Sequence, residues 1–177
     1  MSWSPIFFDV EASGLAGGSF PVEVGWAQLA ADKDEIVSGE MLVRPVEGWT
    51  AWSTLAERVH GLSRDALEQY GRPVEEVAET LDATFGDGVV LSDAPMFDER
   101  WTDRIYQALG RPRRWQIEEA IPVLRRLATT PVDRHWLSQH LDEPKPHRAE
   151  GDARLLAQAC LHLRRQRQLR AQRTGRA

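Results

Sequence analysis

The most informative segment of the chain reads Ile6-Phe7-Phe8-Asp9-Val10-Glu11-Ala12-Ser13-Gly14-Leu15, an apolar run that ends in two alternating carboxylates and a turn of small residues. The apolar run predicts a strand, and side chains two residues apart on a strand point to the same face. Asp9 and Glu11 should therefore project together. Two like charges held this close are unfavourable unless a cation lies between them. Because carboxylates suit Mg²⁺ and Mn²⁺, the segment predicts one side of a divalent-metal site.

The composition is typical of one globular domain. A chain of 177 residues can bury a sizeable core but is short for two domains. No apolar stretch reaches membrane-spanning length, and the N-terminus lacks the basic and apolar regions of a signal peptide. The single cysteine, Cys160, cannot form an internal disulfide and is expected in the core. We therefore expect no membrane partner and a cytoplasmic location.

Charge is distributed unevenly along the chain. No Asp or Glu follows Asp152, whereas seven arginines do, so the first 152 residues carry about −12 and the remainder about +7. Such an asymmetry can indicate nucleic-acid binding. An acidic body holds a polyanion poorly unless some of its acids bind metal ions. The basic end is compatible with phosphate binding, and equally with a solvated helical end that frays.

The order of elements predicts an α/β fold. Strands are expected at 5–10, 22–30 and 35–44, and their short connections favour an antiparallel meander. Helices at 63–70 and 74–85 are followed by a buried strand at 88–92, a helix at 95–109, a strand at 115–117 and helices at 120–128, 134–140 and 150–168. Strands followed by strand–helix alternation indicate a mixed sheet with helices on both faces.

Further candidate metal ligands lie at the predicted element boundaries. Asp98 begins the helix after the strand at 88–92, and Asp152 lies five residues after His147, in the first turn of the last helix. The resulting order is Asp-x-Glu, then Asp, then His-x4-Asp. Asp93 and Asp103 compete with Asp98 for the middle position. Asp98 is favoured over both because it lies at a helix start.

This order resembles that of the DEDDh 3′–5′ exonucleases, the family of ribonuclease T and of the proofreading subunit of bacterial DNA polymerase III. Phe8-Asp9-Val10-Glu11 matches the first motif, Phe97-Asp98 the second, and His147 with Asp152 the third, while His60-Gly61-Leu62 resembles a short turn of these enzymes. The resemblance runs from Ile6 to about Leu163. It implies a ribonuclease-H-like fold, an exonuclease domain at 1–163 and a basic Arg/Gln-rich C-terminal tail at 164–177.

The resemblance also implies a two-metal phosphodiester hydrolase. Two Mg²⁺ or Mn²⁺ ions would be held by four carboxylates: Asp9 would bridge them, Glu11 and Asp152 would complete the site for the attacking water, and Asp98 would support the second ion. His147 would be the general base, because an imidazole pKa of about 6.5 suits proton abstraction near neutrality. Hydrolysis at the 3′ ends of single-stranded DNA or RNA would release nucleoside 5′-monophosphates.

Substrate contacts are expected beside the first motif. By resemblance, the 3′-terminal nucleotide would be bound by Ala12, Ser13, Gly14, Leu15 and His60. Family members usually carry Thr-Thr-Gly or Thr-Ser-Gly where this chain has Ala12-Ser13-Gly14, so one hydroxyl is lost. Bases could also stack on an aromatic side chain, which contributes about 1–3 kcal/mol per base. The candidates for stacking are Trp49, Trp52 and Trp101.

Two other function classes stay open. One is a catalytically silent nucleic-acid-binding or adaptor domain on the same fold. The intact ligand set argues against it, but the second motif often carries a His-Asn pair ahead of its Asp, and this chain has Asp93 and Ala94 there. The other is a plain acidic metal-binding protein, which does not explain a histidine five residues before the last Asp. The expected partner is the 3′ end of single-stranded nucleic acid, and because many members of the family dimerise, a homodimer is also left open.

Overall fold

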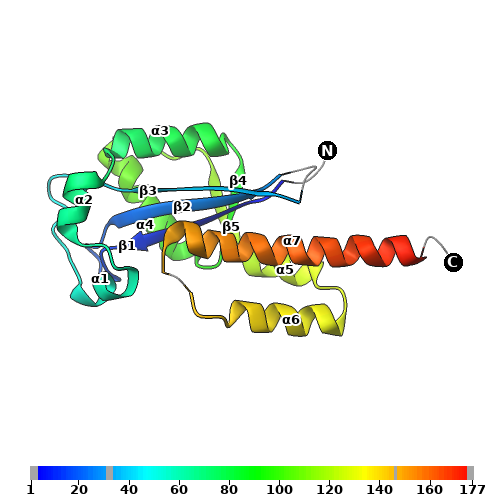
Figure 1. Cartoon of the computed structure of the whole chain (residues 1–177). Coiled ribbons are helices and arrows are strands. Elements are labelled where there is room, and N and C mark those ends of the chain that lie inside the picture. The colour runs from blue at the N-terminus through cyan, green and yellow to red at the C-terminus, as the bar shows by residue number, and fades with distance from the viewer. Residues whose placement is uncertain (1–3, 31–33, 146, 175–177) are drawn as a thin grey trace.

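A single five-stranded sheet forms the centre of the protein. The computed structural model describes residues 4–30, 34–145 and 147–174, and Figure 1 shows its elements. The strand order is β3-β2-β1-β4-β5, with β1, β2 and β3 antiparallel and with β4 and β5 parallel to β1. The strands are β1 (Ile6–Ala12), β2 (Pro21–Leu29), β3 (Ile36–Leu42), β4 (Val89–Ser92) and β5 (Gln116–Glu119).

Helices cover both faces of this sheet. On one face the core joins the sheet to α2, α3 and α4, and on the other it joins the sheet to α5, α6 and α7. In Figure 1, α3 lies on one side of the strands and α7 on the other. The predicted mixed sheet with helices on both faces is therefore confirmed. The helices are α1 (Thr54–His60), α2 (Arg64–Tyr70), α3 (Val74–Phe85), α4 (Pro95–Ala108), α5 (Ala120–Leu127), α6 (Pro131–Leu141) and α7 (Ala149–Thr174).

The central strand β1 is buried on both faces. Phe8 and Val10 belong to the core on the α2–α4 side, whereas Phe7 belongs to the core on the α7 side. Phe7 and Phe8 are completely buried, and burial of such a side chain contributes roughly 1.5–3 kcal/mol. Alternation along the strand then places Asp9 and Glu11 on the face of Phe7, toward α7.

One helix was not predicted from the sequence. Helix α1 is seven residues long, and Ser53 caps its N-terminus by accepting a hydrogen bond from the Ala56 N–H. Gly61 ends it in the left-handed conformation, at a φ of 73°. Only His60 is buried in this helix, so it has no apolar stripe to reveal it. His60, expected in a turn, is therefore the last residue of α1.

The arginine-rich segment continues the last helix. Helix α7 runs without a break from Ala149 to Thr174 and passes through the boundary predicted after Leu163. Arg and Gln are good helix formers, which explains the continuation. Ion pairs join Arg165 to Asp34 (2.8 Å) and Arg170 to Asp133 (2.7 Å). Residues 175–177 of the predicted tail lie outside the described residues, and a separate function for the tail stays a prediction.

Cys160 is fully buried on the inner side of α7, which confirms the prediction that it lies in the core. No helix in the described part of the chain has the length and apolar character needed to cross a membrane.

Candidate functional site

Three elements meet at the C-terminal end of β1. Asp9 is nearly buried there, and Glu11 is half-buried at the end of the strand. Helix α4 begins after β4 with Pro95 at its first turn, and it carries Asp98, which is 1% exposed, in that turn. The Ser92 hydroxyl donates a hydrogen bond to the Asp98 carboxylate. Asp98 thus lies at a helix start beside the acids of β1, as expected.

A glycine in β2 allows the third element to approach. Gly25 lies opposite Asp9 in the antiparallel register. A Cβ atom on Gly25 would lie 2.1 Å from the backbone nitrogen of Glu150. Helix α7 can therefore place its first turn directly against the backbone of β2, and Asp152 reaches the acids of β1 for this reason.

The loop before α7 completes a cluster of three ligand atoms. One donor atom each from Glu11, His147 and Asp152 lies within 4.8 Å of the others. Asp152 is buried, and its Oδ1 has no hydrogen-bond partner among the described residues. His147 is exposed and adopts a φ of 52°, a left-handed conformation that costs a residue with a side chain some strain. A buried, unsatisfied carboxylate oxygen next to a second carboxylate and an imidazole fits a divalent cation.

The carboxylates repel one another strongly. Burial, followed by the charges of Asp98, Glu11 and Asp152, raises the pKa of Asp9 well above its ordinary value. Burial and the neighbouring Asp152 raise the pKa of Glu11 to about 7. Burial raises the pKa of Asp98 to about 8, although the Ser92 hydroxyl opposes this shift. Burial also raises the pKa of Asp152. The structure thus brings all four predicted carboxylates together, and a cation would remove the repulsion.

The two rival aspartates have other partners. Asp93 forms an ion pair with Lys145, which joins the loop before α4 to the loop before α7. Asp103 lies in the second half of α4 and forms an ion pair with Arg113 at 3.2 Å. Asp98 is therefore the acid that α4 contributes to the cluster. The roles of Asp9, Glu11, Asp98, His147 and Asp152 in catalysis stay predictions.

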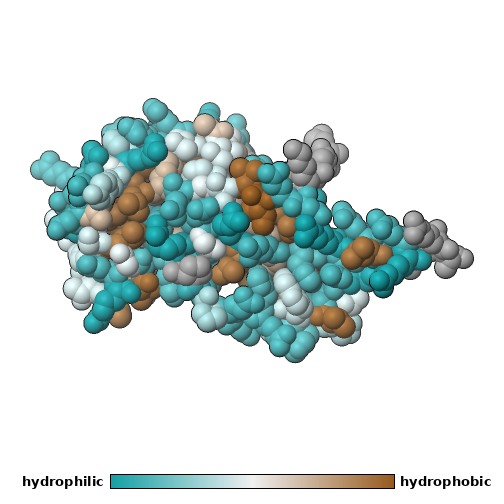
Figure 2. Space-filling model, viewed as in Figure 1, coloured by the Kyte–Doolittle hydropathy of each residue, from teal (hydrophilic) through white to brown (hydrophobic). Residues whose placement is uncertain are grey.

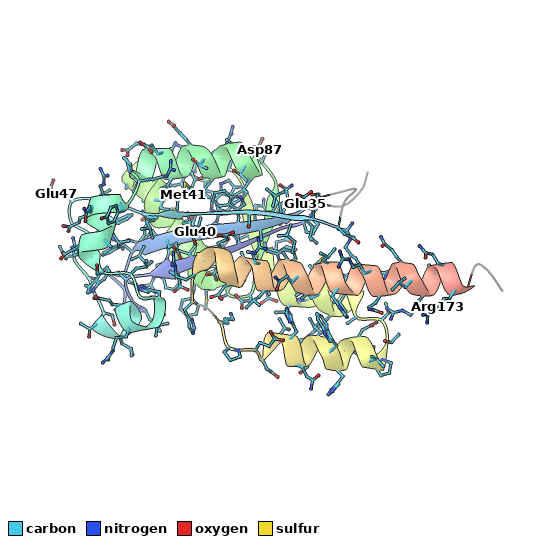
Figure 3. The ribbon with its side chains drawn as sticks, viewed as in Figure 1. Glu35, Glu40, Met41, Glu47, Asp87 and Arg173 are labelled. Carbon is cyan, nitrogen blue, oxygen red and sulfur yellow. The ribbon has the colours of Figure 1, made fainter. Side chains whose placement is uncertain are left out.

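A buried ion pair that the sequence did not reveal holds the start of α7. Glu23 on β2 is fully buried, and both of its oxygens accept hydrogen bonds from Arg148 (2.5–3.1 Å). Glu23 also accepts a hydrogen bond from the Ala149 backbone N–H at 2.9 Å. Arg148 directly follows His147, so this contact fixes the loop that carries the histidine. Glu40 on β3, labelled in Figure 3, is a second and more exposed partner of Arg148 at 3.3 Å.

Glu23→Gln is expected to destabilise the protein by about 1.5–3 kcal/mol, the usual contribution of hydrogen bonds to a charged group. The amide can still accept from Ala149, but it cannot balance the Arg148 charge. Glu40→Gln is the matched control, because it removes the outer partner of the same arginine, where an ion pair contributes about 0–1 kcal/mol. Urea unfolding of both variants measures the difference. Equal losses would show that Glu23 stabilises the start of α7 no more than the exposed Glu40 does.

A cavity of about 370 Å³ lies beside Glu11. Four of the five predicted substrate contacts line it: Ala12, Gly14, Leu15 and His60. Ser13 does not, because it is buried behind the turn, where its hydroxyl accepts a hydrogen bond from the Phe20 N–H at 3.0 Å. The Ser13 side chain stabilises the turn from behind, and a substrate contact of this residue stays a prediction. Exposed apolar residues form much of the rim, namely Leu15, Leu55 and Val59.

His60 forms part of the wall of this cavity. Its Nδ1 accepts a hydrogen bond from the Leu62 N–H at 3.0 Å, so Nε2 carries the proton. Nε2 is buried and has no hydrogen-bond partner among the described residues, although the Ala12 backbone lies near enough to act on the imidazole. Burial lowers the pKa of His60, which favours this neutral form.

The tryptophans proposed for base stacking have structural roles. Trp49 is 6% exposed and stacks on Phe20. Trp101 is equally buried, although one part of it reaches the cavity wall. Trp52 is half-buried and donates a hydrogen bond from its indole N–H to Glu57 at 2.7 Å. All three therefore contribute mainly to packing.

The fold is similar to that of several exonucleases of known structure. E. coli exonuclease I in complex with a dT13 oligonucleotide matches with a TM-score of 0.68 and 16% identity, over 94% of this chain and 42% of that one. The zinc-ion-bound form of the E. coli exonuclease I–ssDNA complex matches with a TM-score of 0.68 and 15% identity, over 96% of this chain and 42% of that one. A 3′-exonuclease in a structure of 3′-end-specific recognition of a histone mRNA stem-loop matches with a TM-score of 0.63 and 16% identity, over 90% of this chain and 63% of that one.

These likenesses concern the fold, because the identities are low. They confirm the predicted ribonuclease-H-like class. The chain spans about two fifths to three fifths of the length of these structures. No protein-family model matches the chain, and a search of curated proteins finds no match.

Proposed function

We propose that the protein is a metal-dependent 3′–5′ exonuclease of the DEDDh type, acting on single-stranded DNA or RNA. The observation that carries this proposal is the cluster at the end of β1, where Glu11, His147 and Asp152 converge beside two further buried acids, Asp9 and Asp98. The fold that places these residues is that of exonucleases bound to an oligonucleotide or to an RNA stem-loop. The proposal combines this fold with a donor set that suits divalent cations.

The carboxylates would hold two Mg²⁺ or Mn²⁺ ions. Asp9, Glu11, Asp98 and Asp152 are the proposed ligands, and the unsatisfied Oδ1 of Asp152 supports this assignment. When bound, such ions lower the pKa of a water molecule and stabilise the negative charge that develops on a phosphate. The protein contributes fixed positions for the ligands, because Gly25 and the Glu23–Arg148 pair hold the start of α7 against the sheet.

His147 would accept the proton of the attacking water. Its exposure and its position near Glu11 and Asp152 place the imidazole at the open side of the cluster. An imidazole in contact with solvent can pass the proton on without a buried relay. The left-handed backbone at His147 supports this role, since strained residues concentrate at functional positions.

The cavity beside Glu11 would bind the 3′-terminal nucleotide. Its volume of about 370 Å³ is at the small end of ligand sites, which suits one nucleotide better than a continuous strand. The apolar rim of Leu15, Leu55 and Val59 would contact the base. His60, which also lines the cavity, would contact the nucleotide. A cavity that holds a single terminal nucleotide supports cleavage from an end of the strand.

A silent binding domain is the second candidate, favoured by one observation. The Asp93–Lys145 ion pair lies at the edge of the cluster, where the exonuclease family often has neutral hydrogen-bonding residues. The test uses 5′-labelled DNA and RNA strands of one sequence, incubated with Mg²⁺ or Mn²⁺ and, in parallel, with EDTA. We expect stepwise shortening from the 3′ end that EDTA stops. We also expect one of the two strands, DNA or RNA, to be shortened faster than the other. Tight binding with intact strands in the presence of both metals would instead establish the silent domain.

A further inference from the structure

The inner stripe of α7 changes from apolar residues to arginine. Leu156, Cys160 and Leu163 are buried against the sheet and α5. Arg167 continues this stripe at helical spacing, and Arg164 lies one turn after Cys160. These arginines are therefore on the side of α7 that faces the rest of the protein. A charged side chain of α7 whose only role was solubility would be expected on the side of the helix that faces solvent.

A groove lies between these arginines and α5. It has a volume of about 440 Å³, and Arg126 of α5 and Arg167 of α7 both line it. The remaining lining is apolar apart from Glu118 at the end of β5. We call this feature the arginine groove; its lining residues are Pro5, Val89, Leu91, Glu118, Val123, Arg126, Leu127 and Arg167. In Figure 1, α5 lies alongside α7, and α7 extends past the body of the protein.

The two arginines that line the groove form no ion pair within the described structure. Among the residues described, no ion pair or side-chain hydrogen bond is found for Arg126 or Arg167, nor for their neighbours on the two helices, Arg125 and Arg164. This contrasts with Arg165 and Arg170 on the same helix, which pair with Asp34 and Asp133. Helix α5 contains no acid, and α7 contains none after Asp152. In Figure 2 the projecting part of α7 is largely hydrophilic. The groove thus combines two arginines that form no ion pair in the described structure with a floor that is apolar apart from Glu118.

We propose that the arginine groove binds the backbone phosphates of the nucleic-acid strand upstream of its 3′ end. This inference rests on the proposed exonuclease function. Arginine is the side chain that best matches phosphate, because its fork donates two hydrogen bonds. The stems of Arg126 and Arg167 can cover the apolar floor while their charged ends meet the phosphates. Residues 1–152 are acidic overall and cannot supply this attraction. The strand would therefore be held at two places, with its 3′ end at the carboxylate cluster and its upstream phosphates at the arginine groove.

The distance between the two places sets a length requirement. Arg167 lies about 22 Å along α7 from Asp152, at a rise of 1.5 Å per residue. A stacked strand advances roughly 3.4 Å per nucleotide, so about six or seven nucleotides are needed to reach from the cluster to the groove. A strand of four nucleotides should contact the cluster alone.

The test measures the salt dependence of binding of 4-mer and 25-mer single strands, with Ca²⁺ replacing Mg²⁺ to slow turnover. Loss of two phosphate contacts in Arg126→Ala/Arg167→Ala should reduce the slope of log K against log salt by about 1.4 for the 25-mer, at roughly 0.7 per contact. The 4-mer should be unaffected. Arg126→Lys/Arg167→Lys should keep most of the slope, because the charge is retained. Thermal unfolding of each variant checks that the fold is intact.

The matched control is Arg44→Ala/Arg72→Ala. These two arginines are exposed, lie next to each other through a backbone hydrogen bond, and do not line the groove. An unchanged salt slope for the 25-mer in Arg126→Ala/Arg167→Ala would overturn the inference. An equal reduction of the slope in the control variant would also overturn it, and so would an equal reduction in the groove variant with the 4-mer. Shortening of the 4-mer by the native protein is measured in parallel. If the native protein shortens neither strand, the proposed function itself fails, whereas shortening with an unchanged slope overturns the groove alone.

Discussion

Asp9→Asn is expected to abolish metal-dependent strand shortening while making the metal-free protein more stable. Asp9 is the most centrally placed acid of the cluster, and the charges of Asp98, Glu11, Asp152 and Asp93 all act on it. Loss of this proposed metal ligand should remove several kcal/mol of transition-state stabilisation. This corresponds to a decrease in turnover on the order of 10³-fold or more. The amide has nearly the same shape but brings no charge into the cluster.

The effect on stability follows from the direction of the pKa shifts. A carboxyl group with a raised pKa in the folded state keeps its proton after the unfolded chain has lost it, so folding becomes less favourable as the pH rises. For this cluster, stability begins to fall above the pH at which ordinary carboxyl groups ionise. It continues to fall to about pH 7 for Glu11 and about pH 8 for Asp98, the raised pKa values of these groups. In EDTA, the melting temperature of the native protein should therefore fall between pH 5 and pH 8, and it should fall less in Asp9→Asn.

Addition of Mg²⁺ or Mn²⁺ should reverse this pattern. A cation that binds only the folded state stabilises it in proportion to the logarithm of its concentration, so the native protein should melt higher with metal at pH 8. Asp9→Asn should lose most of this increase. Asp103→Asn is the control, because Asp103 is a rival acid on the same helix whose partner is Arg113. If Asp9→Asn still gains as much stability from metal as the native protein, Asp9 is not a ligand.

His147→Ala is expected to lower turnover by about 10²–10⁴-fold, the usual contribution of a general base. Metal-dependent stabilisation should remain, since the four carboxylates are intact. The variant His147→Gly should lose the same activity but gain stability, because glycine adopts a φ of 52° without strain. Added imidazole should restore part of the turnover of His147→Gly. Single-turnover rates and melting temperatures measure these effects.

His135 provides the control for this prediction. It is exposed on α6 and matches no motif, so His135→Ala should leave both turnover and metal binding unchanged. If His147→Ala lost metal-dependent stabilisation as completely as Asp9→Asn, the histidine would act as a ligand and not as the base. Turnover equal to that of the native protein would exclude either role.

Much of the fold could be predicted because its main signals are local. The strand with Asp9 and Glu11, the helix start at Asp98 and the spacing from His147 to Asp152 are all short-range patterns, and the structure brings these residues together. Helix α3 has the predicted limits, and most other limits differ by one to three residues, where caps and fraying decide the ends, whereas α7 continues well past its predicted end at residue 168. Helix α1 was missed because caps define it more than any apolar periodicity.

The supports of the site could not be predicted because they depend on pairing between distant segments. The importance of Gly25 becomes visible only once β2 lies opposite Asp9 and α7 crosses it. Glu23 did carry a signal, an acid between Val22 and Val24 in an otherwise apolar strand. Its partner, Arg148, is far away in the sequence and nothing local identifies it. The arginine groove likewise exists only because α5 packs along α7.

The most direct test of the central claim is product analysis with a single strand labelled at its 3′-terminal nucleotide. With Mg²⁺ or Mn²⁺, the native protein should release the label first, as a nucleoside 5′-monophosphate, before any shorter strand loses further nucleotides. EDTA should prevent the release. Label that appears first in longer fragments, or no release from a folded protein that demonstrably binds divalent metal, would contradict the assignment as a 3′–5′ exonuclease.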